Sequence, residues 1–266
     1  MVDAAFSCAA EIAIPQRLWV YTNYDCNLSC SYCVAESHPR AERRGIAGGP
    51  FRQLVVEAAE LGFRELFLTG GEPFLLPDIH EKIALAVSLL PTTVLTNGML
   101  LSGSRLERLL PFREARLTLQ ISIDGHLPEL HDAYRGTGAW AKAVERIREL
   151  KRLGFKVAIG ATETPINAAH IPELRQFVAA LGIAEEEFFI RPLARRGFST
   201  EGSELGASDL VPELTVNNDG YYWHPLTTAP DLLVTKSLFP LRNALTMLHD
   251  QYHAVLASGG RPRPFK

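Results

Sequence analysis

The sequence is poor in cysteine. Among 266 residues there are four cysteines, Cys8, Cys26, Cys30 and Cys33, and none follows the last of them. So few thiols exclude the disulfide framework that stabilises small secreted domains. Because thiols stay reduced in the cytosol, the tight group of the last three indicates a metal site or a catalytic device.

Long hydrophobic runs and a dominant charge are also missing. No stretch reaches the roughly 18 to 20 apolar residues of a membrane span, and no basic region precedes the short apolar run near the start. The net charge of −3 gives no general reason to expect nucleic acid. The cluster of Arg40, Arg43 and Arg44 favours a solvated loop over a phosphate or leader-peptide contact. We expect a soluble, cytoplasmic protein without nucleic-acid or membrane partners.

The chain does have an ordinary globular composition, 47% hydrophobic and 21% charged, which is enough for a sizeable core. From Arg17 to about Arg191, short β-branched runs alternate with amphipathic stretches of helical period, which is typical of βα units around a parallel sheet. The predicted strands are 17–22, 65–69, 92–96, 116–123, 156–162 and 187–192. The predicted helices are 50–61, 78–89, 103–110, 139–153 and 171–181.

Six βα units are too few for a closed eight-stranded barrel. We therefore predict an α/β fold, a partial (β/α)6 TIM-like barrel at 17–198, whose missing quarter leaves a lateral opening for substrate. An N-terminal extension, 1–16, precedes the barrel. A C-terminal appendage, 199–266, is expected to hold a β-hairpin at the NDG turn of 218–220, a helix at 239–257 and a loose tail.

Polar and glycine residues gather at the ends of the first four predicted strands. The cysteine group follows the first strand, the glycine-rich segment 70–73 the second, Asn97 the third, and Ser122 and Asp124 the fourth. In barrels of this kind the chemistry takes place at the carboxyl ends of the strands. The distribution therefore predicts a single site.

The clustered cysteines have the spacing C-x3-C-x2-C, with Tyr32 directly before the last one. A short loop with this spacing can wrap three thiolates around one face of a metal cluster. Structural zinc takes four protein ligands, so Cys8 or His38 could be a fourth. A cubane iron–sulfur cluster held by three cysteines leaves one iron open to a small molecule. The spacing and the aromatic residue favour the iron–sulfur cluster.

With these motifs the sequence resembles the radical SAM superfamily. The family's C-x3-C-x-aromatic-C motif matches the cysteine group and Tyr32, and its GGEP segment matches 70–73. The stretch ISIDGHLPELHDAYRG is similar to the peptide-maturase and anaerobic sulfatase-maturase branch, which carries SPASM or twitch regions. The likeness covers roughly 17–200.

The resemblance implies an enzyme with two cofactors. Cys26, Cys30 and Cys33 would ligate one 4Fe–4S cluster, and S-adenosylmethionine (SAM) would bind at its open iron. One electron, from a donor such as flavodoxin or ferredoxin, would cleave SAM to methionine and a 5'-deoxyadenosyl radical, which abstracts a hydrogen atom from substrate. The residues of the chain would hold and orient both molecules.

The resemblance also implies roles for residues near the open iron. Backbone groups of Thr69, Gly70 and Gly71 would meet the ammonium group of SAM, since glycines permit close approach. Glu72 would fix that loop. Asp124, at a strand end, is the candidate catalytic acid that orients substrate or takes a proton, although a helix or turn cap explains it equally well.

The remaining groups of SAM would meet residues from other strand ends. Ser122 and Arg135 would bind its carboxylate, with the guanidinium offering a bidentate fork. Ser122 and Asn97 would meet the ribose hydroxyls. The adenine would lie against Tyr32 and the backbone near Leu193.

The sequence departs from this branch after the barrel. Maturases of the branch usually continue into a cysteine-rich region with auxiliary clusters, whereas no cysteine follows Cys33. We predict a single cluster, with 199–266 as a degenerate twitch-like appendage that has lost its metal. The aromatic run 221–224 could line the substrate mouth or only pack. Cys8 could donate hydrogen, although inert packing is the commoner role of an isolated cysteine.

These features favour a tailoring reaction in natural-product biosynthesis on a small molecule or a peptide. Without auxiliary clusters, redox-neutral outcomes are favoured over oxidations that pass an electron to a second cluster. Only about sixteen residues precede the first strand, so a peptide (RiPP) epimerase or maturase would need a separate leader-binding partner. The alternative of another class is a non-catalytic iron–sulfur or zinc sensor, which the GGEP segment disfavours.

Overall fold

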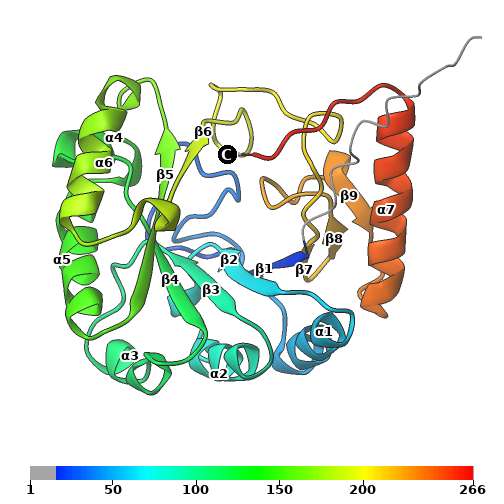
Figure 1. Ribbon diagram of the computed structural model, residues 1–266, viewed down its shortest axis with the longest axis horizontal. Helices are drawn as coiled ribbons and strands as arrows, with labels where there is room; N and C mark the ends of the chain where they lie inside the picture. Colours follow the sequence, from blue (N-terminus) through cyan, green and yellow to red (C-terminus); the bar gives the residue numbers. More distant parts are fainter. Residues whose placement is uncertain (1–15, 266) are drawn as a thin grey trace, which may run out of the picture.

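The computed structural model of the protein describes residues 16–265, so Cys8 and nearly all of the expected N-terminal extension lie outside the described part. Nine strands form one sheet in the order β6-β5-β4-β3-β2-β1-β7-β8-β9. Its parallel strands β1 to β6 are Arg17–Asn23, Glu65–Gly70, Thr92–Thr96, Leu117–Ser122, Lys156–Glu163 and Phe188–Pro192. The sheet curves without closing, because β6 and β9 are its two edges (Figure 1).

Helices surround the outer face of this curved sheet (Figure 1). They are α1 to α7, at Gly48–Glu60, Ile79–Leu89, Ser104–Glu107, Pro128–Arg135, Ala139–Arg152, Ile171–Ala180 and Leu241–Ala257. The strands bury apolar side chains such as Val20, Leu68 and Leu119 toward these helices, and all three are 0% exposed. None of the helices in residues 16–265 has the length and apolar character needed to cross a membrane.

The six predicted strands are all present, and the predicted partial α/β barrel is confirmed. The helix expected at 103–110 is wrong in its length. It ends at Glu107, and Pro111 lies in a separate 3₁₀ turn, because proline has no N–H to continue a helix. The eight-residue α4 was not predicted, although it ends at Arg135 and therefore carries a site residue.

The C-terminal region continues the barrel sheet. Strand β7 (Thr215–Asn217) pairs in parallel with β1, and β8 (Gly220–Tyr222) pairs antiparallel with β7, which forms the predicted hairpin. A further strand, β9 (Leu233–Thr235), was not predicted. The expectation of a loose tail is wrong: the segment after α7 runs back toward β6, and Arg263 forms a bridge with Leu210 (Figure 1).

The inner face of the sheet is unlike its outer face. Phe67 stacks on the buried Trp19 with ring centroids 4.1 Å apart. Beyond this pair, small or polar side chains from β3, β4 and β5 line the lumen, among them Thr93, Thr118 and Ala158. Because such side chains do not fill the interior, the lumen keeps space for a ligand.

Glu72 ties the end of β2 to the end of β3. Its carboxylate is 0% exposed and accepts hydrogen bonds from the Thr96 hydroxyl (2.8 Å) and from the backbone N–H groups of Phe74 and Asn97 (3.0 and 2.9 Å). Burial raises the pKa of Glu72 to about 7, although these hydrogen bonds act in the opposite direction. The folded protein therefore holds a proton here that an unfolded chain releases near pH 4.5.

This difference predicts a pH-dependent stability. Because the folded pKa is raised, the contribution of Glu72 to the free energy of unfolding should be fully present below pH 4.5 and be lost as the pH rises through 7, by about 3 kcal/mol in total. Glu72→Gln should abolish this part of the slope. Urea denaturation at pH 4 to 8 measures it. The control is Glu81→Gln, at an exposed ion pair with Arg108, and a Glu72→Gln slope equal to the wild-type slope would contradict the assignment.

Candidate functional site

The three clustered cysteines line one pocket at the carboxyl ends of the parallel strands. The pocket has a volume of about 240 Å³. Cys26 is buried, whereas Cys30 and Cys33 are partly exposed toward the pocket. Backbone hydrogen bonds shape the loop that carries them, from Cys33 N to Cys30 O (3.1 Å) and from Cys26 N to His38 O (3.3 Å). The loop is also tied to α4, because Ser31 N donates to Tyr134 O (3.1 Å).

The structure brings most of the predicted cofactor contacts to this same pocket. The lining includes Tyr32, Thr69, Gly70, Gly71, Asn97, Ser122, Arg135 and Leu193. Glu72, the residue predicted to fix the glycine loop beside the cofactor, does not line the pocket, because its buried carboxylate points into the protein. Its hydrogen bonds hold the loop, as expected. Asp124 is likewise absent from the pocket lining.

The two glycines after β2 allow the cysteine loop to pack directly on their backbone. Gly71 N donates to Asn23 O (2.9 Å), and Glu72 N donates to Asp25 O (2.9 Å). A Cβ atom on Gly71 would lie 2.1 Å from Asp25 O, and one on Gly70 would lie 2.2 Å from Asn23 O. Both distances are far below van der Waals contact, so no other residue fits either position without moving the start of the cysteine loop.

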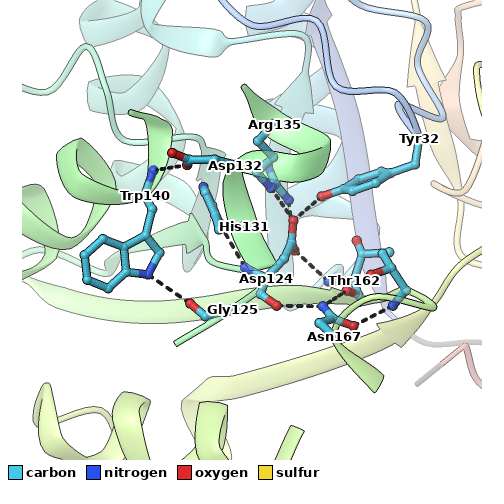
Figure 2. A network of polar contacts seen from close by, with 10 residues as sticks. Tyr32, Asp124, Gly125, His131, Asp132, Arg135, Trp140, Thr162 and Asn167 are labelled. Atoms are coloured by element: carbon cyan, nitrogen blue, oxygen red, sulfur yellow. Dashed lines mark hydrogen bonds and ion pairs between the residues drawn. The ribbon is translucent and has the colours of Figure 1, made fainter. Parts of the chain in front are cut away.

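Asp124 lies at the centre of a polar network behind the pocket (Figure 2). Its carboxylate is 0% exposed. Oδ2 accepts from the Tyr32 hydroxyl and from Arg135 Nε, both at 2.5 Å, and Oδ1 accepts from Arg135 Nη2 (3.3 Å) and from Thr162 N (2.9 Å). The Asn167 amide donates to its backbone carbonyl at 2.6 Å. Both carboxylate oxygens therefore already have protein donors.

The charge of Arg135 controls the ionisation of this network. Burial alone would raise the pKa of Asp124, but the nearby guanidinium and its hydrogen bonds outweigh burial and hold that pKa below its usual range. The same pairing holds the pKa of Arg135 well above its usual range despite burial. At neutral pH the two groups form a buried ion pair. Arg135 also lines the pocket. The Tyr32 hydroxyl keeps its proton because burial raises its pKa.

The donor set of the pocket fits a cluster held by three thiolates. Burial raises the pKa of Cys26 to about 12 and of Cys30 to about 11, so binding a metal there must release protons. In residues 16–265, no three His, Cys, Asp or Glu side chains are placed to hold one metal ion. His38, the alternative fourth zinc ligand, does not line the pocket, and its Nδ1 accepts from Arg40 N. Three thiols spread around one wall suit a cluster with several irons.

Several pocket residues were missed at the level of sequence. Thr162, Arg191 and Pro192 come from the ends of β5 and β6, and Phe265 comes from the C-terminal region. His224, in the aromatic run that could line the mouth or only pack, does line the pocket. The alternation of the predicted strand 187–192 would have placed the Arg191 side chain on the inner face. Nothing in the sequence indicates that the last residues return to the barrel mouth.

The chain is similar to curated proteins of differing activity. It is 32% identical over 198 residues to an AdoMet-dependent heme synthase of Oleidesulfovibrio alaskensis, which covers 73% of this chain and 49% of the relative. It is 29% identical over 183 residues to a PqqA peptide cyclase of Granulibacter bethesdensis, covering 67% and 48%. The chain thus spans about half the length of these relatives.

A solved structure shares the fold. The structure of native anSMEcpe with bound AdoMet has a TM-score of 0.67 and 14% identity, and the match covers 90% of this chain and 82% of that one. The model of the Radical SAM superfamily matches residues 20–178, which include the cysteine loop and the first five strands. The chain therefore belongs to the radical SAM superfamily, whose enzymes use S-adenosylmethionine and a 4Fe–4S cluster.

Proposed function

We propose that the protein uses a single 4Fe–4S cluster to cleave SAM reductively and to abstract a hydrogen atom from its substrate, as a tailoring step in natural-product biosynthesis. One observation carries the proposal. Three thiols from the loop after β1, the backbone of the Gly-Gly segment at the end of β2 and the guanidinium of Arg135 at the end of α4 line the same pocket. The family match supports this chemistry.

Each part of the pocket has a task in this proposal. When bound, the cluster and SAM supply the electron and the 5'-deoxyadenosyl radical. Cys26, Cys30 and Cys33 hold the cluster. Carbonyl groups near Gly70 and Gly71 accept from the ammonium group of SAM. These contacts orient SAM and take no part in the cleavage of its bond.

The remaining contacts fix the other parts of SAM. Arg135 and Ser122 bind its carboxylate, and Asn97 binds the ribose. Tyr32 and the backbone near Leu193 border the adenine. All five residues line the pocket, which supports these roles.

We assign Asp124 a positioning role in place of the expected catalytic one. A catalytic acid must reach the substrate, yet this carboxylate is 0% exposed and both of its oxygens accept hydrogen bonds from the protein. Its contacts with Arg135 and Tyr32 instead hold two pocket residues in place. A buried bidentate pair restricts the guanidinium to one orientation, which suits recognition of a second carboxylate.

The substrate is a small molecule or a peptide. A heme synthase and a peptide cyclase match the chain at similar identity and over similar shares of its length, so the relatives support both classes. The sheet is not closed between β6 and β9, and Figure 1 shows the loop after β6 and the C-terminal segment lying across that side, so either class would enter past them.

Anaerobic reconstitution with iron and sulfide tests the cluster and its ligands. The wild type should bind four irons and, with dithionite, release 5'-deoxyadenosine from SAM. Cys30→Ala should lose both the cluster absorbance and the nucleoside, because two thiolates no longer hold the cluster. The matched control Cys8→Ala should keep both. Chromatography and iron analysis give the readouts.

Three results would contradict this proposal. Tetrahedral zinc in the purified protein would favour a structural or sensor role, as would an intact cluster that yields no nucleoside with any candidate substrate. Loss of the cluster in Cys8→Ala would show that the ligand set is wrong.

Asp124→Asn tests the positioning role. Without the second anionic oxygen, Arg135 loses its bidentate partner, so the affinity for SAM should fall about tenfold, the order of one hydrogen bond to a charged group. Isothermal titration calorimetry on the oxidised, cluster-loaded protein measures this affinity without turnover.

Asp132→Asn is the control on the same helix. Asp132 accepts from the backbone N–H groups of Gly138 and Trp140 and does not touch Arg135 (Figure 2). Asp132→Asn should lower the free energy of unfolding and leave the affinity for SAM unchanged. Equal SAM affinities in Asp124→Asn and the wild type would refute the positioning role.

A further inference from the structure

A second, larger cavity of about 1130 Å³ occupies the lumen toward the amino ends of the strands. It adjoins the cysteine pocket, because both are lined by Trp19, Arg191, His224, Pro225 and Phe265. The proposed roles of the cysteine pocket leave this cavity without a function. A chamber next to a bound SAM is the place where a substrate can meet the radical.

Arg191 stands at the junction of the two cavities without a partner. In residues 16–265 no oxygen lies within hydrogen-bond or ion-pair distance of its guanidinium, whose carbon is 5.7 Å from the Trp19 ring centroid. The neighbouring acid is Glu213, but Glu213 Oε2 accepts from Trp19 Nε1 at 2.6 Å and forms no salt bridge with Arg191. The second cation of the cysteine pocket, Arg135, is neutralised by Asp124.

The other charges around the cavity mostly neutralise one another. Arg17 pairs with Glu65 at 2.7 Å and Lys156 with Glu187 at 2.9 Å, and Arg175 pairs with Glu185. Arg64 also lines the cavity, but it is exposed to solvent. Arg191 is thus the cation inside the described lumen that forms no ion pair or hydrogen bond with an acid, although the charge of Glu213 acts on it from a longer distance. A guanidinium held between an aromatic ring and a cavity binds carboxylates well because its hydrogen-bond donors stay free.

Gln120 offers a second polar group to the same cavity. Its side chain is 5% exposed, lines the same cavity, and its amide has no hydrogen-bond partner in the described residues. Space for it depends on Gly160, where a Cβ atom would lie 2.6 Å from Gln120 Nε2. The fully buried polar atoms without a partner in the described residues do not include the Gln120 amide, so the amide reaches the cavity, where a polar group of a ligand can bond to it in place of water.

We propose that the lumen is a substrate site for a small organic carboxylate, with Arg191 binding the carboxylate and Gln120 binding a second polar group of the same molecule. This deepens the proposed function and rests on it, since the site would hold the substrate beside SAM. The volume of the cavity suits a molecule of drug-like size or somewhat larger.

Equilibrium dialysis with a matched pair of probes tests the site. 2-Naphthoate and 2-naphthamide share their rings and differ in charge, so their affinity ratio measures the contribution of the carboxylate. The whole chain is loaded with its cluster and with saturating SAM in the cysteine pocket. It should bind naphthoate about tenfold more tightly than naphthamide, as expected for one charged hydrogen-bonded contact. Arg191→Gln should remove this preference and leave naphthamide binding unchanged.

Further variants separate recognition from folding. Arg191→Met keeps part of the aliphatic stem and should give the same result as Arg191→Gln, so it carries the test if that variant unfolds. Gln120→Met keeps the volume and should weaken 6-hydroxy-2-naphthoate, which carries a second polar group, about threefold through the lost amide contact, and leave 2-naphthoate unchanged. The control Arg175→Gln, at an exposed ion pair on the cavity rim, should retain the preference for naphthoate.

The inference fails if the wild type shows no preference for naphthoate, or if folded Arg191→Gln and Arg191→Met keep the wild-type ratio. An unchanged affinity of 6-hydroxy-2-naphthoate for Gln120→Met would remove Gln120 from the site. The dialysis needs no SAM cleavage. A protein that binds naphthoate as expected but forms no 5'-deoxyadenosine would therefore contradict the proposed function alone, and the reverse result would contradict the inference alone.

Discussion

The close packing of the Gly70–Gly71 backbone on the start of the cysteine loop is the contact on which the site depends. It joins the end of β2 to the end of β1 through two backbone hydrogen bonds, to Asn23 O and Asp25 O. The Asn23 amide reinforces it by donating to Glu72 O at 3.0 Å. Because β-carbons are absent, the loop can lie flat against the strand end, and this brings its thiols into the pocket that the other strand ends line.

Two buried acids behind this contact join the ends of neighbouring strands to one another. Glu72 joins β2 to β3, and Asp124 joins β4 to β5, α4 and the cysteine loop. Each acid is 0% exposed, and each has donors for both oxygens. They differ in charge: burial dominates at Glu72 and raises its pKa, whereas the Arg135 ion pair dominates at Asp124 and lowers it. Of these two acids, Asp124 is therefore the one that carries a fixed negative charge beside the pocket.

The arrangement of cations divides the interior into two compartments with different chemistry. In the cysteine pocket, Arg135 is held and compensated by Asp124. In the adjoining lumen, Arg191 forms no ion pair within residues 16–265 and packs on Trp19, with Glu213 acting on it only from a longer distance. A compensated guanidinium offers directional hydrogen bonds with little net charge, and an uncompensated one offers attraction as well. One arginine can thus orient a bound group in the cysteine pocket, and another can attract an anion into the lumen.

The sequence alone determined the six parallel strands, the cysteine motif and its adjacency to the GGEP segment, because these follow from local periodicity and from short motifs. It could not determine that Glu72 and Asp124 turn away from the pocket, since the direction of a side chain at a strand end depends on which donors the neighbouring strands present. Only the tertiary structure decided that β7 extends the sheet beside β1, that Phe265 returns to the barrel mouth, and that Arg191 and Gln120 have no side-chain hydrogen-bond partner among residues 16–265. Such contacts join residues far apart in the chain, and long-range packing decides them.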